Sequence, residues 1–277
     1  MDTWKNKVAI ITGSSMGIGF ALARQILEGG GSVVINGRNP QKLQAAKAAL
    51  EQHGFQPLAV AADISVWEDC ERLIQETVSH FGRLDILINN AGVATRGSVE
   101  NMTHEVMAKV LTVNINGCVF PTKAALPHLI SSQGSVSFVS SIASFYGLPF
   151  NSVYAASKRA LGTFAEALRI ESKQAGLHVG VAYVGFTEND PKKVVMDADG
   201  KPIYLPNREG IKKQTPDQVA SIILRMIRRR KAQVVLSPMG KGLYLASRLF
   251  PGLIGWFLQK NYSTIKAQAE TEAKSAK

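Results

Sequence analysis

Short runs of apolar residues alternate along most of the chain with segments in which apolar residues recur every three or four positions. The runs cover residues 8–12, 32–36, 58–62, 84–89, 136–140, 179–183 and 232–236. Runs of this length predict strands that are buried on both faces, and the recurring pattern between them predicts helices. Their regular alternation favours right-handed crossovers and a parallel sheet with helices on both faces.

Polar residues mark the predicted starts of several helices. Three pairs have the required spacing: Asn39 with Pro40, Ser65 with Glu68, and Thr215 with Gln218. The first combines an N-cap with a proline in the first turn, and the other two have the spacing of a capping box. The helical pattern over 104–130 is expected to be interrupted or bent near Pro121 and Pro127, because proline lacks the N–H of a helix interior.

Residues 185–215 break this rhythm. They lose all periodicity and carry Gly, Pro, Asn and Asp, which predicts a long functional loop or lid. The chain has 277 residues, enough for one large α/β domain. We therefore expect a single Rossmann-like, doubly wound α/β domain over 1–240 and a C-terminal amphipathic extension over 241–277. Ligands of such sheets bind beyond the carboxyl ends of the strands, so these ends hold the candidate functional residues.

The turn after the first predicted strand is rich in glycine. Residues 12–19 read TGSSMGIG, with three glycines between a strand and a helix. Such glycines let the backbone turn tightly and approach a pyrophosphate, which lies on the free N–H groups of the helix start. The residues expected to bind a dinucleotide here are Gly13, Ser15, Gly17, Ile18 and Gly19.

Three residues in the second half have side chains suited to acid–base chemistry. Tyr154 and Lys158 are four positions apart and so share one face of a predicted helix. A phenol has a pKa of about 10 in water, and a neighbouring ammonium lowers that pKa toward the working range. Ser141 ends a predicted strand, where its hydroxyl can donate a hydrogen bond to a carbonyl oxygen that gains negative charge.

The glycine spacing resembles the TGxxxGxG turn of the short-chain dehydrogenase/reductase family, and further motifs extend the resemblance over nearly the whole chain. Residues 89–92 read NNAG, as that family does after its fourth strand. Asn114 stands where the family has a helix asparagine. Residues 154–158 match YxxxK, and Ser141 lies thirteen residues before the tyrosine, the family's usual interval. Five matches in the correct order are not expected by chance.

This resemblance implies an oxidoreductase that works on a carbonyl or alcohol with a nicotinamide cofactor and without a metal. It implies that Tyr154 is the general acid in ketone reduction and the base in alcohol oxidation. Lys158 is implied to hold the nicotinamide ribose as well, and Asn114 to order a water for proton relay. The other cofactor contacts that the resemblance implies are Asp63 and Ile64 at the adenine, and Asn90, Ala91 and Gly92 after the fourth strand.

The end of the second predicted strand bears on the choice of cofactor. An acid there would accept hydrogen bonds from a ribose 2′-hydroxyl and repel a 2′-phosphate. Residues 36–39 read NGRN, without an acid, and the guanidinium of Arg38 is a planar fork suited to a phosphate. The sequence therefore predicts NADP(H).

The stretch after the sixth predicted strand departs from the family pattern. The family usually has Pro-Gly there, followed by a threonine that meets the nicotinamide carboxamide. In this chain Val184 replaces the proline and Asn189 occupies the usual threonine position. Val184 and Thr187 are the candidates for contact with the nicotinamide.

Composition and charge narrow the class of protein. The apolar fraction of 45% is too high for intrinsic disorder. Cys70 and Cys118 lie far apart, which disfavours a disulfide scaffold and a structural zinc site. No stretch approaches the roughly 20 apolar residues of a membrane span, and the first residues lack a signal-peptide pattern. We therefore expect a cytoplasmic protein, with the alternative of a peripheral position at a membrane surface.

The net charge of +11 belongs to one end of the chain. Residues 1–200 carry 17 basic and 17 acidic side chains, so the whole excess lies in 201–277. A nucleic-acid binder needs a basic stripe with residues that read the bases, and a cluster near one end argues against that class.

Residues 242–260 are apolar, rich in aromatic residues, flanked by bases and interrupted by Pro251. Three interpretations stay open: an interfacial membrane anchor through 225–260, a wall of an apolar substrate site, or a subunit contact. The substrate is accordingly expected to be hydrophobic or lipid-like, and the family resemblance implies a homodimer or homotetramer. The alternative to an enzyme is a non-catalytic NADP-binding, membrane-associated protein, in which Tyr154 and Lys158 only grip the ribose.

Overall fold

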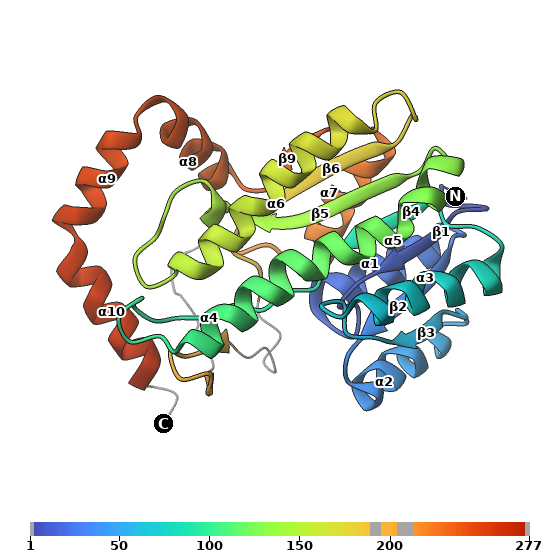
Figure 1. Ribbon diagram of the computed structural model, residues 1–277, viewed down its shortest axis with the longest axis horizontal. Coiled ribbons are helices and arrows are strands. Elements are labelled where there is room, and N and C mark those ends of the chain that lie inside the picture. Colours follow the sequence, from blue (N-terminus) through green and yellow to red (C-terminus); the bar gives the residue numbers. More distant parts are fainter. Residues whose placement is uncertain (1–2, 189–194, 204–212, 275–277) are drawn as a thin grey trace.

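A computed structural model describes residues 3–188, 195–203 and 213–274, and these residues form a parallel sheet of seven strands (Figure 1). The strands are β1 (Val8–Ile11), β2 (Ser32–Gly37), β3 (Leu58–Ala61), β4 (Ile86–Asn89), β5 (Ser135–Ser141), β6 (His178–Val184) and β9 (Gln233–Val235). Their order across the sheet is β3-β2-β1-β4-β5-β6-β9. The prediction of a doubly wound α/β fold is confirmed, and the order reverses between β1 and β4.

Helices cover both faces of this sheet. The helices on one face are α1 (Gly17–Glu28), α2 (Pro40–Glu51) and α7 (Pro216–Arg228), and those on the other are α3 (Trp67–Phe81), α5 (Gly117–Ser131) and α6 (Ser152–Glu171). The central strands β1 and β4 are buried throughout because each side of the sheet meets one of these layers.

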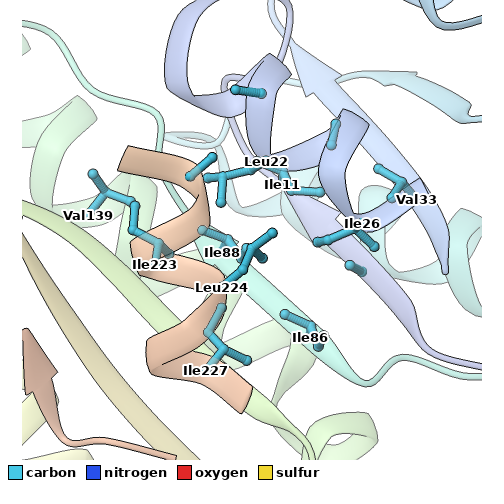
Figure 2. Close-up of a cluster of buried hydrophobic side chains, with 14 of the residues drawn as sticks. Ile11, Leu22, Ile26, Val33, Ile86, Ile88, Val139, Ile223, Leu224 and Ile227 are labelled. Atoms are coloured by element: carbon cyan, nitrogen blue, oxygen red, sulfur yellow. The ribbon is translucent and has the colours of Figure 1, made fainter. Parts of the chain in front are cut away.

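The core between the sheet and the first layer shows how α1 and α7 are held side by side (Figure 2). Leu22 of α1 and Ile223 of α7 are buried in one cluster with Ile11 and Ile88 of the central strands. Burial of each such side chain contributes about 1.5–3 kcal/mol. The helix after Thr215 is thereby fixed over the same central strands whose carboxyl ends carry the glycine turn.

Helix starts agree with the sequence in two of three cases. The side chain of Asn39 accepts a hydrogen bond from the Lys42 N–H, and Thr215 forms a reciprocal capping box with Gln218. The capping box expected at Ser65 is wrong. The Ser65 hydroxyl donates to Asp63 Oδ1 at 2.6 Å instead, and α3 begins two residues later, at Trp67.

The helical stretch expected over 104–130 is interrupted, but the interruption lies before the two prolines. It consists of α4 (His104–Leu111), a π-helical turn (Thr112–Asn116) and α5, which contains both prolines. Proline removes an N–H and pushes on the carbonyl four residues earlier. For Pro121 that residue is Gly117, the first residue of α5, so the π-helical turn lies before the position on which the proline acts. The helix interior accommodates Pro127 without a break.

The segment predicted as a loop or lid contains some regular structure. The described part holds two short antiparallel strands, β7 (Val195–Met196) and β8 (Pro202–Ile203). Thr187 also pairs with Gln214 in an isolated bridge, which brings the two ends of the segment together. Asn189, at the usual threonine position, lies outside the described residues, as do the rest of 189–194 and 204–212.

Three helices follow β9: α8 (Pro238–Leu249), α9 (Pro251–Lys260) and α10 (Tyr262–Lys274). They form an arc at one end of the molecule, at the opposite end from α2 (Figure 1). We call residues 238–274 the C-terminal arm. Within the described ranges, no helix has the length and apolar character needed to cross a membrane.

Candidate active site

The glycine turn lies at the point where the strand order reverses, between the carboxyl ends of β1 and β4. The Thr12 hydroxyl accepts the N–H groups of Asn90 and Ala91, at 3.0 and 3.1 Å. The Asn90 amide donates back to the carbonyl oxygens of Thr12 and Gly13, at 2.9 and 3.0 Å. These four hydrogen bonds join the turn after β1 to the NNAG segment after β4, so Asn90 shapes the turn.

Glycine is required at three positions of the turn. Gly13 has a φ of +62°, and a Cβ on it would lie 2.8 Å from Ala91. Gly17 has a φ of +57°, which side chains rarely adopt. A Cβ on Gly19 would collide with the Gly13 carbonyl oxygen and lie 2.6 Å from Asn90 Nδ2. The helix α1 then begins without a side-chain cap among the described residues and without an acid in its first turn. Free N–H groups at a helix start are the arrangement that binds a pyrophosphate, so Gly13, Ser15, Ile18 and their neighbours fit a dinucleotide.

At the end of β2 the polar groups divide between the interior and the surface. Asn36 is buried, and its amide donates to the carbonyl oxygens of Val60 and Ala62, both at 3.2 Å. Arg38 is half-exposed, and its Nη1 lies 3.6 Å from Asp63 Oδ2. Arg38 is therefore the basic side chain at the end of β2, beside the carboxylate of Asp63.

Asp63 stays ionised at this edge. Burial on its own raises the pKa of the Asp63 carboxyl, but hydrogen bonds from Ser65 and the charge of Arg38 outweigh it and lower the pKa below its ordinary value. Ile64, expected beside the adenine, is buried against α5, where a Cβ on Gly117 would lie 2.7 Å from its Cδ1. Its part in an adenine site remains a prediction.

Lys158 is the most unusual side chain of the site. It is only 5% exposed, yet within the described part of the chain no carboxylate pairs with its ammonium. Nζ donates to the Val139 carbonyl oxygen of β5 at 3.0 Å, and the Lys158 carbonyl accepts a 2.7 Å hydrogen bond from the Ser140 hydroxyl. An ammonium has three N–H donors, so the site leaves donors for a ligand.

Tyr154 and Ser141 flank this lysine from the helix and from the strand. The Lys158 ammonium lies 5.9 Å from the centre of the half-buried Tyr154 ring, as the spacing of four residues predicts. Ser141 is the last residue of β5, directly after the two residues that bond Lys158. Its Oγ accepts the Ala143 N–H at 3.2 Å, which leaves the hydroxyl proton for another acceptor.

Asn114 lies in the π turn, where a helix widens by one residue. Its Oδ1 accepts the Val93 N–H at 2.8 Å, and its Nδ2 donates to the Val93 carbonyl and to the Ser157 hydroxyl, at 2.9 and 3.0 Å. A Cβ on Gly92 would lie 3.0 Å from Asn114 Oδ1 and 3.1 Å from Lys158 Nζ. The backbone at Gly92 is thus within contact distance of both side chains.

The two candidates after β6 differ. Val184 is the last residue of β6, pairs with Ser141 in the sheet and has its side chain in the core. The hydroxyl of Thr187 is buried and has no hydrogen-bond partner among the described residues. A buried hydroxyl without a partner is costly, which marks Thr187 as the better candidate for a polar contact with a ligand.

Residues that sequence reasoning did not single out provide much of the support. Thr12, Ser140 and Ser157 are buried hydroxyls that each hold a candidate residue in place. Each of these residues is the immediate neighbour of a motif residue in the sequence. A small polar residue next to a motif residue in a predicted buried segment is the sequence feature that could have identified them. Within the described residues, no cluster of His, Cys, Asp and Glu could hold a metal ion.

A glycine turn at the reversal of a parallel sheet, joined to a segment that lies against a buried lysine, is typical of a Rossmann-type nucleotide-binding site. Residues 7–199 match the family model described as short chain dehydrogenase. A protein named 11-beta-hydroxysteroid dehydrogenase 1A from Arabidopsis thaliana is 33% identical over 276 residues, which are 96% of this chain and 78% of the relative. The chain belongs to the short-chain dehydrogenase/reductase family.

Solved structures share the fold. A short-chain dehydrogenase/reductase from Burkholderia phymatum in complex with NAD superposes with a TM-score of 0.77 at 21% identity, over 92% of this chain and 96% of that one. A metagenomic short-chain oxidoreductase in complex with NADP gives a TM-score of 0.70 at 23% identity, over 85% and 99%. At these identities the likeness concerns the fold, which is common to NAD- and NADP-bound proteins.

Proposed function

We propose that this oxidoreductase reduces a ketone to a secondary alcohol with NADPH, or catalyses the reverse reaction, on a hydrophobic substrate. The observation that carries the proposal is the buried Lys158 ammonium, which has no carboxylate partner in the described structure and lies beside Tyr154. Burial without a counter-ion is unfavourable for a cation. A site that retains such a cation uses its charge in chemistry.

The proposed reaction assigns one task to each residue. The hydride would come from NADPH when that cofactor is bound. The Tyr154 phenol gives its proton to the carbonyl oxygen of the substrate, and the charge of Lys158 stabilises the phenolate that remains. The free hydroxyl proton of Ser141 is donated to the same oxygen as negative charge develops. In alcohol oxidation Tyr154 takes the proton instead.

The residues around Lys158 would hold the cofactor and restore the proton. Lys158 has donors left for ribose hydroxyls, and the Thr187 hydroxyl is suited to the nicotinamide carboxamide. Asn114 keeps Ser157 and the 92–93 backbone in register behind them. We propose that Asn114 positions a water molecule that contacts Lys158, and that a proton returns to Tyr154 through this water.

Arg38 supports NADPH as the cofactor. Its guanidinium is half-exposed at the end of β2, where no acid stands to accept the 2′-hydroxyl of NADH. The fold alone does not choose, since structures of this fold hold either cofactor. A guanidinium binds a phosphate through two parallel hydrogen bonds, so Arg38 is the proposed partner of the 2′-phosphate.

The hydrophobic substrate is supported by the side chains that follow Ser141. The Phe145 ring contacts Tyr183 at a tilted angle and Tyr244 edge to face, and Phe150 stacks on Tyr262 of the C-terminal arm. The relative from Arabidopsis is named for a hydroxysteroid. A ring system or acyl chain fits these aromatic surroundings better than a small polar ketone.

The test is NADPH oxidation with ketones graded by chain length and ring number, using the wild type, Tyr154→Phe and Tyr244→Phe. We expect turnover that improves with apolar size, a fall of about 100-fold or more in kcat for Tyr154→Phe, and near wild-type rates for Tyr244→Phe. The control removes a phenol hydroxyl whose neighbour is Gln233, in β9. Tight NADP binding without turnover on any carbonyl would favour the alternative of a non-catalytic NADP-binding protein.

A further inference from the structure

The outer side of α9 is an apolar surface that is exposed to solvent. Leu253, Trp256 and Phe257 are 63%, 56% and 57% exposed. Their spacing of three and four residues places them on one face of the helix. Leu249 and Phe250, at the end of α8, extend the same surface and are also exposed. We call these five residues the α9 face.

Packing within the chain does not explain this face, because α9 is held to the body by its opposite side. Ile254 and Leu258 are half-buried, and a Cβ on Gly255 would lie 2.8 Å from the Tyr146 hydroxyl. A helix that serves only as a cover needs one apolar side. Here a second one, formed by large side chains, points away from the described chain.

The charge of the C-terminal arm is positive on balance. Residues 238–274 contain five basic side chains and two acidic ones, and both acids, Glu270 and Glu272, are near the end of α10 rather than in α8 or α9. Two of the basic side chains lie over aromatic rings at the borders of the face: Lys260 Nζ is 5.0 Å from the Trp256 ring, and the Arg248 guanidinium is 5.1 Å from the Tyr244 ring. A long cation beside an aromatic ring is the arrangement found where apolar chains meet lipid headgroups.

We propose that the α9 face inserts into the headgroup region of an anionic lipid bilayer. Apolar burial would supply the affinity, and the surrounding cations would select anionic lipid. A second copy of this chain is a less favourable partner for the α9 face than a bilayer. A two-fold contact places the same surface on both sides, and two copies of this surface would face each other with like charges.

The C-terminal arm also contacts the segment that joins Ser141 to Tyr154. A Cβ on Gly240 of α8 would lie 2.7 Å from Ile142, Tyr244 makes an edge contact with the Phe145 ring, and Tyr262 of α10 stacks on Phe150. A bilayer bound at the α9 face would thus lie on the far side of this arm from the candidate site. Resting on the function proposed above, a substrate dissolved in the membrane would then be separated by the arm from the segment that joins Ser141 to Tyr154.

The test measures binding of the full-length chain to vesicles, without substrate or cofactor. Sedimentation with phosphatidylcholine–phosphatidylserine vesicles is compared with pure phosphatidylcholine, at low and high salt. We expect binding to the anionic vesicles that salt weakens, together with a blue shift of Trp256 fluorescence. The double variant Leu253→Ser/Phe257→Ser should lose roughly tenfold or more in vesicle affinity, and Lys260→Gln should weaken binding to anionic vesicles only.

Two matched controls separate this face from general surface properties. Ile170→Ser removes another apolar side chain, 78% exposed on α6, and Lys42→Gln removes a charge on α2; both should bind as the wild type does. Absence of binding to anionic vesicles overturns the proposal. So does a dimer, measured by light scattering, that the double variant dissociates, since the face then binds a second copy. Either result leaves the carbonyl-reductase test unaffected, because that test is run in solution.

Discussion

Arg38 offers the sharpest test of the cofactor assignment. Replacing it with aspartate removes the guanidinium at the end of β2 and adds an acid that a ribose 2′-hydroxyl can use. A hydrogen bond to a charged group is worth about 1.5–3 kcal/mol, which corresponds to roughly a 10- to 150-fold change in affinity. The new carboxylate also repels a phosphate, by about 1 kcal/mol at ~4 Å in water. We therefore expect NADP to bind roughly 70- to 900-fold more weakly.

The geometry limits how large this effect becomes. The Arg38 guanidinium is half-exposed and already lies 3.6 Å from Asp63, so part of its charge is offset before any cofactor binds. Losing Arg38 should also raise the pKa of the Asp63 carboxyl, because the arginine charge is one of the causes that lower it. NAD should gain modestly, since its hydroxyl obtains an acceptor and loses no partner.

Titration calorimetry with NADP and NAD measures both effects without a known substrate. Lys42→Asp is the matched control, because it makes the same charge change on the exposed side of the neighbouring α2. The expected result is a reversed preference in Arg38→Asp and an unchanged preference in the control. Equal losses in both variants would mean that net charge, rather than Arg38, attracts the phosphate, and no change in Arg38→Asp would refute the assignment.

Three further changes test the turn and the stability of the fold. Gly19→Ala places a methyl group against the Gly13 carbonyl and Asn90, so dinucleotide affinity should fall roughly tenfold or more; calorimetry with unchanged affinity would contradict this. Asp85 is buried and accepts hydrogen bonds from Arg83, Lys7 and the Val8 N–H. Burial opposes ionisation, but these bonds lower its pKa, so its stabilisation is present above about pH 4 and is lost as pH falls. Asp85→Asn should lower the free energy of unfolding by about 1–3 kcal/mol at neutral pH in urea titrations, and by less in acid. Burial lowers the pKa of His178 below 6.5, although the hydrogen bond to the Lys231 carbonyl acts in the opposite direction. As the pH falls, the unfolded chain therefore takes up a proton at this residue before the folded chain does, so the free energy of unfolding should decline below about pH 6.5. His178→Gln should make that decline shallower.

The sequence predicted the strands well because burial on two faces leaves a local signal. Val8–Ile11 and Ile86–Asn89 are continuous apolar runs, and both are central strands. The glycine turn and the spacing of Tyr154 to Lys158 are local as well, so they could be placed before any contact was known. Their chemical roles remain proposals.

The misses depended on contacts between distant parts of the chain. Ser65 has the spacing of a cap, but Asp63 competes for its hydroxyl, and that choice depends on how the end of β3 meets α3. The break around Asn114 comes from a wider helical turn, which no residue type marks by itself. The sequence shows that the C-terminal arm is apolar and basic. It does not show which side of α9 packs on the rest of the protein, because that depends on the fold.

The π turn has a consequence for how this chain tolerates changes in length. A π turn amounts to one residue more than an α-helix needs at that point. Deleting a single residue there, such as Ile115, would restore a regular α-helix and keep the flanking helices close to their present phase, but the wider turn that places the Asn114 side chain would be lost. Asn114 could then no longer face both Val93 and Ser157, although the sheet would keep its strands. The loss of one residue in this stretch would therefore leave the sheet intact but remove the hydrogen bonds that Asn114 makes to Val93 and Ser157.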